Sequence, residues 1–219
     1  MNYRVRKSIG IFFTMKLPKS FIVVFSLFCI ESVLSGNRMI GGEKNAGVFS
    51  LQSITTDQKP FSMESLRKNK ASVLLFLSES CPICQKYSPT LRKLYQDFSD
   101  ENIEFYGVFP SMFIVHDSVV GFAKKFNLPF TMLIDSSQSI TSILNAKITP
   151  EVFVISGEGE VLYRGRIDNL FPAIGRKRFS ATSHELRDTL SAIARETAIQ
   201  YKETEPVGCF IEFATVQKE

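Results

Sequence analysis

The chain has 219 residues, of which 44% are hydrophobic and 22% charged, a composition that excludes a disordered chain and indicates a globular protein. Residues 1–35 hold five of the 26 basic residues and one of the 22 acidic residues, so the formal net charge of +4 lies in that segment and the rest is neutral. A neutral body lacks the basic surface that phosphate backbones require, so no nucleic-acid partner is expected.

The first 35 residues have the pattern of a secretory signal. Lys16 and Lys19 precede the apolar run 21–30, and small residues follow it. The run is shorter than the roughly 20 residues that span a bilayer. We therefore predict a signal peptide or N-terminal anchor over residues 1–35, and a protein that is exported to the periplasm or anchored in the membrane facing it. Lipidation at Cys29 and a buried N-terminal helix stay open as alternatives.

The next segments lead into one predicted domain. Residues 36–47 are polar and Gly-rich and are expected to form a linker, followed by a single domain over residues 48–219. Within that domain, residues 49–55 alternate as a strand does, and residues 57–60 carry a turn signal. A short helix is expected over residues 62–68, with Ser62 as its N-cap.

The central pattern is a buried strand followed directly by two cysteines. Residues 72–77 form a continuous apolar run with the length of a strand that is buried on both faces. Cys81-Pro82-Ile83-Cys84 comes next, and apolar side chains then recur every three or four residues as far as Phe98. That spacing predicts an amphipathic helix beginning at the cysteine pair.

Strands and helices alternate after this helix. Strands are predicted at residues 103–109, 130–134, 151–155 and 161–166, and helices at residues 119–126, 139–144 and 184–196. The last two strands flank a Gly-containing turn and are expected to form a hairpin. The fold class predicted from this order is α/β, with a mixed central sheet flanked by helices.

The position of the cysteine pair favours redox chemistry. A zinc site needs about four ligands, and the chain offers no second close pair of ligands, so no metal site is predicted. At the start of a helix, unpaired backbone N–H groups and the helix dipole stabilise a thiolate. We therefore expect Cys81 to be exposed, with a lowered pKa, and to act as the nucleophile. Cys84, one turn into the helix, would close the redox-active disulfide.

These residues resemble those of the thioredoxin-like superfamily, and within it the exported redoxin group of TlpA/ResA-like proteins, which are related to AhpC/TSA peroxiredoxin-like proteins. The resemblance rests on the Cys81–Cys84 motif after a strand, on Thr149-Pro150 before the strand 151–155, and on the preamble 49–66, which looks like the N-terminal hairpin extension of the group. It implies a cis peptide bond before Pro150 and a substrate segment held by Thr149 and Pro150. It further implies an extracytoplasmic thiol–disulfide oxidoreductase with protein or small-molecule thiol substrates and no cofactor. Residues 163–169 and 207–211 also resemble a bacterial redoxin subgroup. No functional role is assigned to their charges, which are expected to form salt bridges at the edge of the hairpin.

The sequence departs from thioredoxin at two positions. Ser80 stands where the Trp before the first cysteine is expected, and Leu75 stands where a buried carboxylate assists proton transfer. Glu79 is expected to face solvent rather than to replace that carboxylate. A peroxiredoxin-like thiol peroxidase stays open as an alternative, although the Pro and hydroxyl positions of peroxiredoxins are occupied here by Leu74 and Ser78.

A second alternative is a copper-binding module of the SCO type. That group spaces its cysteines by three residues and adds a His ligand, whereas His116 and His184 are expected at the surface of this protein.

Cys209 is a third thiol, which would be buried and inert, joined to another chain, or a further resolving thiol. The run 176–178 of basic residues is expected to form a solvated loop.

Overall fold

The computed structural model describes residues 46–213, which all belong to one compact unit. The predicted signal or anchor at 1–35 and most of the predicted linker at 36–47 lie outside the described residues, and the boundaries of the domain stay a prediction. No helix among residues 46–213 is long and apolar enough to cross a membrane.

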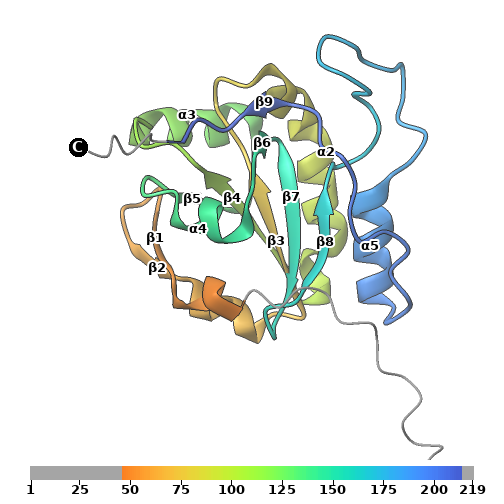
Figure 1. The fold of residues 1–219 in the computed structure, drawn as a ribbon, viewed down its shortest axis with the longest axis horizontal. Coiled ribbons are helices and arrows are strands. Elements are labelled where there is room, and N and C mark those ends of the chain that lie inside the picture. Colours follow the sequence, from red (N-terminus) through yellow and green to blue (C-terminus); the bar gives the residue numbers. More distant parts are fainter. Residues whose placement is uncertain (1–45, 214–219) are drawn as a thin grey trace, which may run out of the picture. The chain divides into compact units, whose positions relative to one another are not determined.

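The described chain folds around a seven-stranded mixed sheet with the strand order β2-β1-β5-β4-β3-β7-β8 (Figure 1). The pairs β5–β4 and β4–β3 are parallel, and the other four pairs are antiparallel. The strands of this sheet are β1 (Gln52–Thr55), β2 (Pro60–Ser62), β3 (Ala71–Phe76), β4 (Ile103–Phe109), β5 (Thr131–Ile134), β7 (Glu151–Ser156) and β8 (Val161–Gly165). A separate small sheet pairs β6 (Ile148–Thr149) with β9 (Cys209–Phe210).

Helices cover both faces of the large sheet. The α-helices are α2 (Pro82–Phe98), α3 (His116–Phe126), α4 (Ser139–Leu144) and α5 (Glu185–Ala194), and the 3-10 helices are η1 (Ala46–Ser50), η2 (Met63–Lys68) and η3 (Ser99–Glu101). Because strand side chains alternate between faces, Val73 and Leu75 pack with α2, α3 and α5, whereas Leu74 and Phe76 pack with α4, η1 and η2. The predicted α/β class, with its mixed central sheet flanked by helices, is confirmed.

The N-terminal hairpin is also confirmed, with one change. Strands β1 and β2 pair antiparallel around a turn in which Gln58 has a φ of 58°. Ser62 caps η2 by accepting a hydrogen bond from the backbone N–H of Glu64. The strand predicted to begin at Phe49 begins only at Gln52, because Phe49 belongs to η1, where its side chain is buried.

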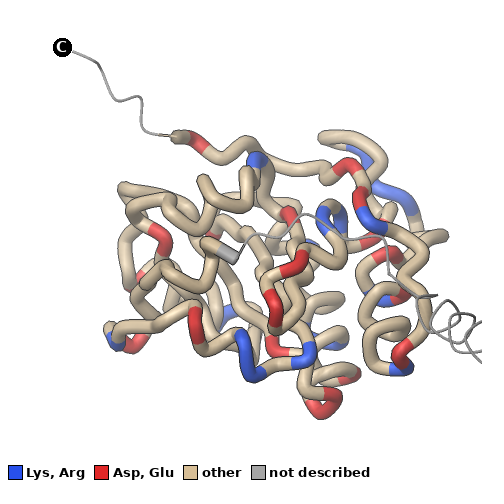
Figure 2. Tube along the Cα trace, turned by 60° about the horizontal axis from the view of Figure 1, so that its bottom comes forward, with Lys and Arg blue, Asp and Glu red and all other residues tan. Residues whose placement is uncertain are grey.

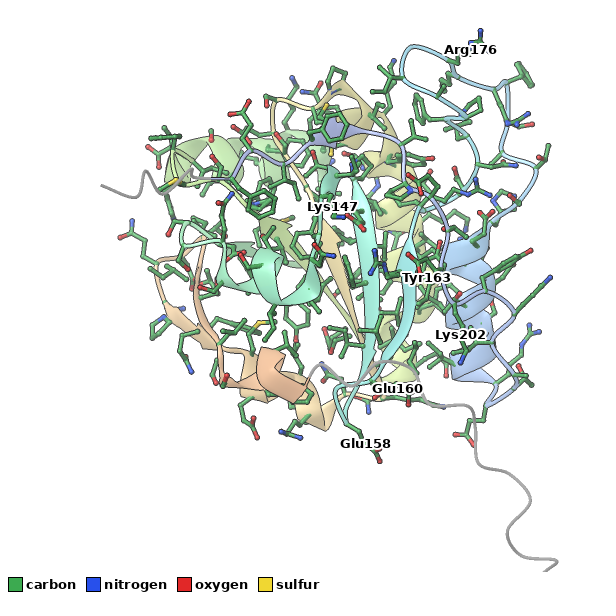
Figure 3. All side chains as sticks on the ribbon, viewed as in Figure 1. Lys147, Glu158, Glu160, Tyr163, Arg176 and Lys202 are labelled. Carbon is green, nitrogen blue, oxygen red and sulfur yellow. The ribbon has the colours of Figure 1, made fainter. Side chains whose placement is uncertain are left out.

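Basic and acidic residues are interspersed along the described chain, in keeping with its neutral composition (Figure 2). The basic run 176–178 lies in an exposed loop, as predicted, and Arg176 projects outward from that loop in Figure 3. Tyr163 is fully buried between β8 and α5.

Candidate functional site

The cysteine pair lies where the central strand β3 gives way to helix α2. Cys81 is the N-cap of α2, and Pro82 occupies the first turn, where its missing N–H costs nothing. Cys84 is one turn further on, and its side chain is 1% exposed. Both sulfurs therefore lie at the beginning of a helix that follows a buried apolar strand, as predicted from the sequence.

Cys81 is surrounded by hydrogen-bonding groups. Its Sγ lies 2.9 Å from the Sγ of Cys209, and it lies 3.2 Å from the carbonyl oxygen of Thr149, to which the protonated thiol donates. The thiol of Cys84 hydrogen bonds to Cys81 and lowers its pKa to about 5, with further contributions from the Cys209 thiol and from the backbone N–H groups of Cys84 and Ile83. Cys81 is therefore a thiolate at neutral pH, and its neighbours stabilise the charge.

The other two thiols stay protonated. Burial raises the pKa of Cys84 well above its usual range, and the charge on Cys81 raises it further. Burial, together with the hydrogen bond to Cys81 and the charge on Cys81, raises the pKa of Cys209 to about 11. All three cysteines of the described chain are free thiols. They form one cluster in which Cys81 carries the negative charge and the other two donate to it.

Strand β6 forms the wall that faces Cys81. The peptide bond between Thr149 and Pro150 is cis, as the resemblance implied, and Thr149 is 3% exposed. The buried carboxylate of Glu151 accepts hydrogen bonds from the backbone N–H groups of Lys147 and Ile148, at 2.8 and 3.2 Å. This carboxylate positions β6 beside the cysteines. The sequence pattern had not indicated this role for Glu151.

The free edge of β6 is covered by strand β9 of the same chain. Thr149 pairs with Cys209, and Ile148 pairs with Phe210. The approach requires a glycine, since a Cβ on Gly208 would lie 2.1 Å from the carbonyl oxygen of Thr149. The edge that was expected to hold a substrate segment is thus occupied by the chain's own C-terminal strand.

Three side chains differ in exposure from what the sequence suggested. Cys81 was expected to be exposed but is 1% exposed, because Thr149 and Cys209 lie against its sulfur. Cys209, for which burial was one of three alternatives, is not buried, because its strand lies at the surface with Cys209 and Phe210 both exposed. Glu79 is half-buried and lines a pocket rather than facing open solvent.

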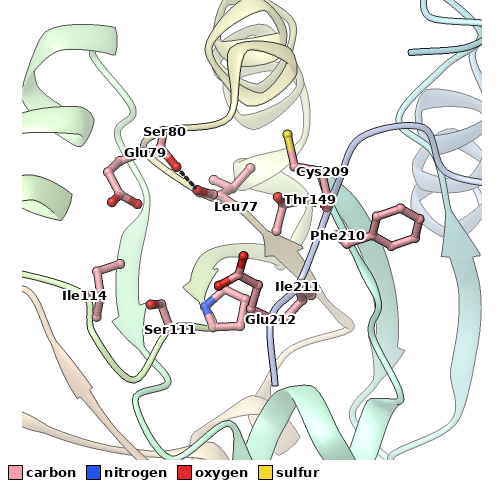
Figure 4. A pocket seen from close by; sticks show the side chains of 12 residues that line it. Leu77, Glu79, Ser80, Ser111, Ile114, Thr149, Cys209, Phe210, Ile211 and Glu212 are labelled. Carbon is pink, nitrogen blue, oxygen red and sulfur yellow. Dashed lines mark hydrogen bonds between the residues drawn. The ribbon is translucent and has the colours of Figure 1, made fainter. Parts of the chain in front are cut away.

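A pocket of about 310 Å³ opens beside this cluster. Figure 4 shows Cys209 and Thr149 on one side of it, with the sulfur of Cys209 directed toward the beginning of α2, and Glu79 and Ser80 on another side (Figure 4). The remaining lining residues are Leu77, Ser78, Pro110, Ser111, Ile114, Phe210, Ile211 and Glu212. Cys209 is the one thiol of the described cluster that lines the pocket.

Helix α2 is also held by buried polar interactions, which the sequence pattern had not indicated. The hydroxyl of Tyr87 donates to Asp168 at 2.7 Å, and the guanidinium of Arg166 pairs with the buried carboxylate of Glu185. Burial and the neighbouring Asp168 raise the pKa of Tyr87. The charges in the segment 163–169 thus have a structural role, and the ion pairs of Arg164 and Arg166 agree with the salt bridges expected from the sequence.

The residues considered for metal binding form no such site. His184 is the exposed N-cap residue of α5, and His116 begins α3, where it contacts Asp117. Across residues 46–213, no group of three or more His, Cys, Asp or Glu side chains is arranged to hold a metal ion.

Comparison with known proteins agrees with the fold. A model of the AhpC/TSA family matches residues 43–164. The thiol-disulfide oxidoreductase ResA of Bacillus subtilis (strain 168) is 26% identical over 134 residues, which are 60% of this chain and 71% of that protein.

Two solved structures extend the likeness to the fold. An uncharacterized conserved protein from Geobacillus kaustophilus superposes with a TM-score of 0.70 at 20% identity, covering 81% of this chain and 94% of that one. Peroxiredoxin Q of Xanthomonas campestris superposes with a TM-score of 0.52 at 16% identity, covering 70% of this chain and 95% of that one. At these identities the likeness shows the fold, which is thioredoxin-like.

Proposed function

The chain belongs to the AhpC/TSA family, and from this premise we propose that it is a thiol–disulfide oxidoreductase acting through Cys81 and Cys84. The observation that carries the proposal is the pairing of a thiolate with a protonated thiol one helical turn away: the pKa of Cys81 is about 5, and the Cys84 thiol hydrogen bonds to it. Such a pair supplies both the attacking group and the resolving group of a disulfide exchange. The likeness to ResA supports the same chemistry.

The exchange needs no cofactor. The Cys81 thiolate attacks one sulfur of a substrate disulfide, the substrate S–S bond breaks, and the other substrate sulfur leaves as a thiolate that takes a proton. Cys84 then loses its proton and attacks the Cys81 sulfur, which releases the first substrate sulfur and leaves a Cys81–Cys84 disulfide. The reverse sequence oxidises a substrate dithiol. We propose that Thr149 and Pro150 line the approach to Cys81, because the Thr149 carbonyl already contacts its sulfur.

A thiol peroxidase is the second candidate, and the family and the low pKa of Cys81 favour it. The surroundings of Cys81 argue against it. The hydroxyl of Ser78, three residues before Cys81, bonds to Ser80 at 2.9 Å. Leu74 is fully buried in β3 and offers no polar group. Among residues 46–213, no hydroxyl hydrogen bonds to the sulfur of Cys81, whereas its two thiol partners, Cys84 and Cys209, suit disulfide exchange.

We propose that the protein works outside the cytoplasm, on protein or small-molecule thiols and disulfides. The basic and apolar pattern of residues 1–35 supports export. Membrane association through that segment stays a prediction. The neutral charge of the rest of the chain supports the absence of a nucleic-acid partner.

The test is an insulin-reduction or thiol-exchange assay on the wild type and on the variants Cys81→Ser and Cys84→Ser. We expect Cys81→Ser to be inactive, and the double variant Cys84→Ser/Cys209→Ser, which lacks both thiols that contact Cys81, to accumulate a mixed disulfide with the substrate. Cys209→Ser provides a third thiol-to-hydroxyl variant for comparison. Unchanged activity in both Cys81→Ser and Cys84→Ser would contradict the proposal. Peroxide turnover faster than disulfide exchange would favour the second candidate.

A further inference from the structure

The third thiol of the cluster is the one that solvent reaches. Cys209 comes 128 residues after Cys81 in the sequence, yet the two sulfurs are 2.9 Å apart. Cys81 and Cys84 are each 1% exposed, whereas Cys209 is exposed. A molecule arriving from the pocket therefore meets Cys209 before it meets either of the other sulfurs.

Backbone hydrogen bonds on both sides hold Cys209 in this place. Before it, the N–H of Thr204 donates to the carbonyl of Arg164 in β8 at 3.0 Å. After it, the N–H of Ile211 donates to the carbonyl of Lys147 at 2.8 Å. Between these anchors, β9 pairs with β6, and Gly208 allows the close approach. The contact between Cys209 and Cys81 is thus a product of the fold and not of a loose terminus.

We propose that Cys209 is the outer thiol of a three-cysteine relay, in which a Cys81–Cys84 disulfide is converted to a Cys81–Cys209 disulfide that exchanges with substrate thiols. The proposal rests on the proposed function and assigns the residue at which the substrate reacts. Cys81 is common to both disulfides, because its sulfur contacts both of the other thiols.

Each step of the relay is a balanced thiol–disulfide exchange. Cys209 gives up its proton and its thiolate attacks the sulfur of Cys81, so that the Cys81–Cys84 bond breaks and Cys84 leaves and takes a proton. A substrate thiolate then attacks the sulfur of Cys209, and Cys81 leaves as a thiolate. A second substrate thiolate attacks the substrate sulfur that is bound to Cys209, and Cys209 leaves and takes a proton. The substrate dithiol is oxidised, the protein is reduced by the same two electrons, and the reverse order reduces a substrate.

The electrostatics of the cluster favour the step in which the substrate attacks Cys209 and Cys81 leaves. A thiol with a low pKa is a good leaving group, and the pKa of Cys81 is about 5. The charge on Cys81 helps to raise the pKa of Cys209 to about 11. That charge disappears when Cys81 enters a disulfide with Cys84, so Cys209 ionises more readily in the oxidised protein, which is the state in which it must attack.

Disulfide mapping tests the contact directly. The full-length Cys84→Ser variant is reduced, oxidised with diamide and mapped by peptide mass spectrometry, which also distinguishes Cys29. We expect a Cys81–Cys209 disulfide as the main internal product. The matched control adds Cys209→Ser and Phe210→Cys to the same variant. Neighbouring strand side chains point to opposite faces, so the displaced thiol turns away from Cys81 and no internal disulfide with Cys81 is expected.

A kinetic measurement tests whether the contact is used. A dithiol peptide is mixed with oxidised wild-type protein or with the oxidised Cys209→Ser variant in a single turnover. We expect the variant to react at least about tenfold more slowly, because the peptide must then attack a buried sulfur. The relay is overturned if Cys84→Ser forms no Cys81–Cys209 disulfide. It is also overturned if Cys209→Ser reacts at the wild-type rate while Cys81→Ser is inactive, a result that leaves the proposed function standing. If wild type is no more active than Cys81→Ser, both proposals fail.

Discussion

The charge on Cys81 makes the stability of the reduced protein depend on pH in a predictable direction. The pKa of Cys81 is about 5 in the folded protein, against an ordinary value of 9.0. The folded chain binds this thiol proton less tightly than the unfolded chain does. The resulting stabilisation of the folded state is therefore complete above pH 9.0 and is lost as the pH falls through about 5. At about pH 7 the ionisation contributes about 3 kcal/mol to the free energy of unfolding, because each pH unit above the folded pKa adds about 1.4 kcal/mol.

Urea unfolding of reduced wild type and reduced Cys81→Ser, at several pH values from about 5 to about 8, measures this contribution. A change in packing gives a difference in the free energy of unfolding that is the same at every pH, whereas the thiolate gives a difference that grows with pH. Cys84→Ala serves as the matched variant, because it removes the hydrogen bond that lowers the pKa of Cys81 most and so moves the rise in the free-energy difference to higher pH. If the difference in the free energy of unfolding between wild type and Cys81→Ser stays the same at all of these pH values, the Cys81 thiolate does not stabilise the folded protein.

Two further substitutions test how the cluster is held. Gly208→Ala places a Cβ 2.1 Å from the Thr149 carbonyl oxygen, so we expect strand β9 to be displaced, the free energy of unfolding to fall by about 1–3 kcal/mol, and the thiol contact to be lost in disulfide mapping. Gly121→Ala in helix α3 is the control, since a Cβ there meets nothing within 4 Å, and a neutral or slightly stabilising effect is expected in the same unfolding assay. Tyr87→Phe leaves the buried Asp168 without the hydroxyl that donates to it at 2.7 Å, and a loss of about 1–3 kcal/mol in urea unfolding is expected. An unchanged midpoint for Tyr87→Phe would show that the network does not support helix α2.

The central strand and the following helix could be predicted because their signals are local. The apolar run ending at Leu77 predicted β3, and the three- and four-residue spacing after Cys84 predicted α2. The cis bond before Pro150 followed from the resemblance and is present in the structure. The beginning of β1 could not be predicted, because Phe49 fits a strand by alternation but is buried within a 3-10 helix.

The missed features of the site all depend on contacts between distant residues. Strand β9 has two residues, too few to show a strand pattern, and it exists because β6 offers an edge beside Cys81. The Tyr87–Asp168 hydrogen bond joins residues 81 positions apart. Gly208, directly before Cys209, could have indicated the contact, because a glycine in a strand often marks a close approach of another backbone.

The sequence by itself determined the local arrangement on which the proposed chemistry depends: two cysteines at the junction of a buried strand and a helix, where backbone N–H groups lower the pKa of the first. Periodicity and residue type carry that information because strand, turn and helix are local structures. Only the tertiary structure decided which thiol lines the pocket. Packing of the C-terminal strand against Thr149 buries Cys81 and leaves Cys209 exposed beside it, and no local pattern encodes a contact across 128 residues.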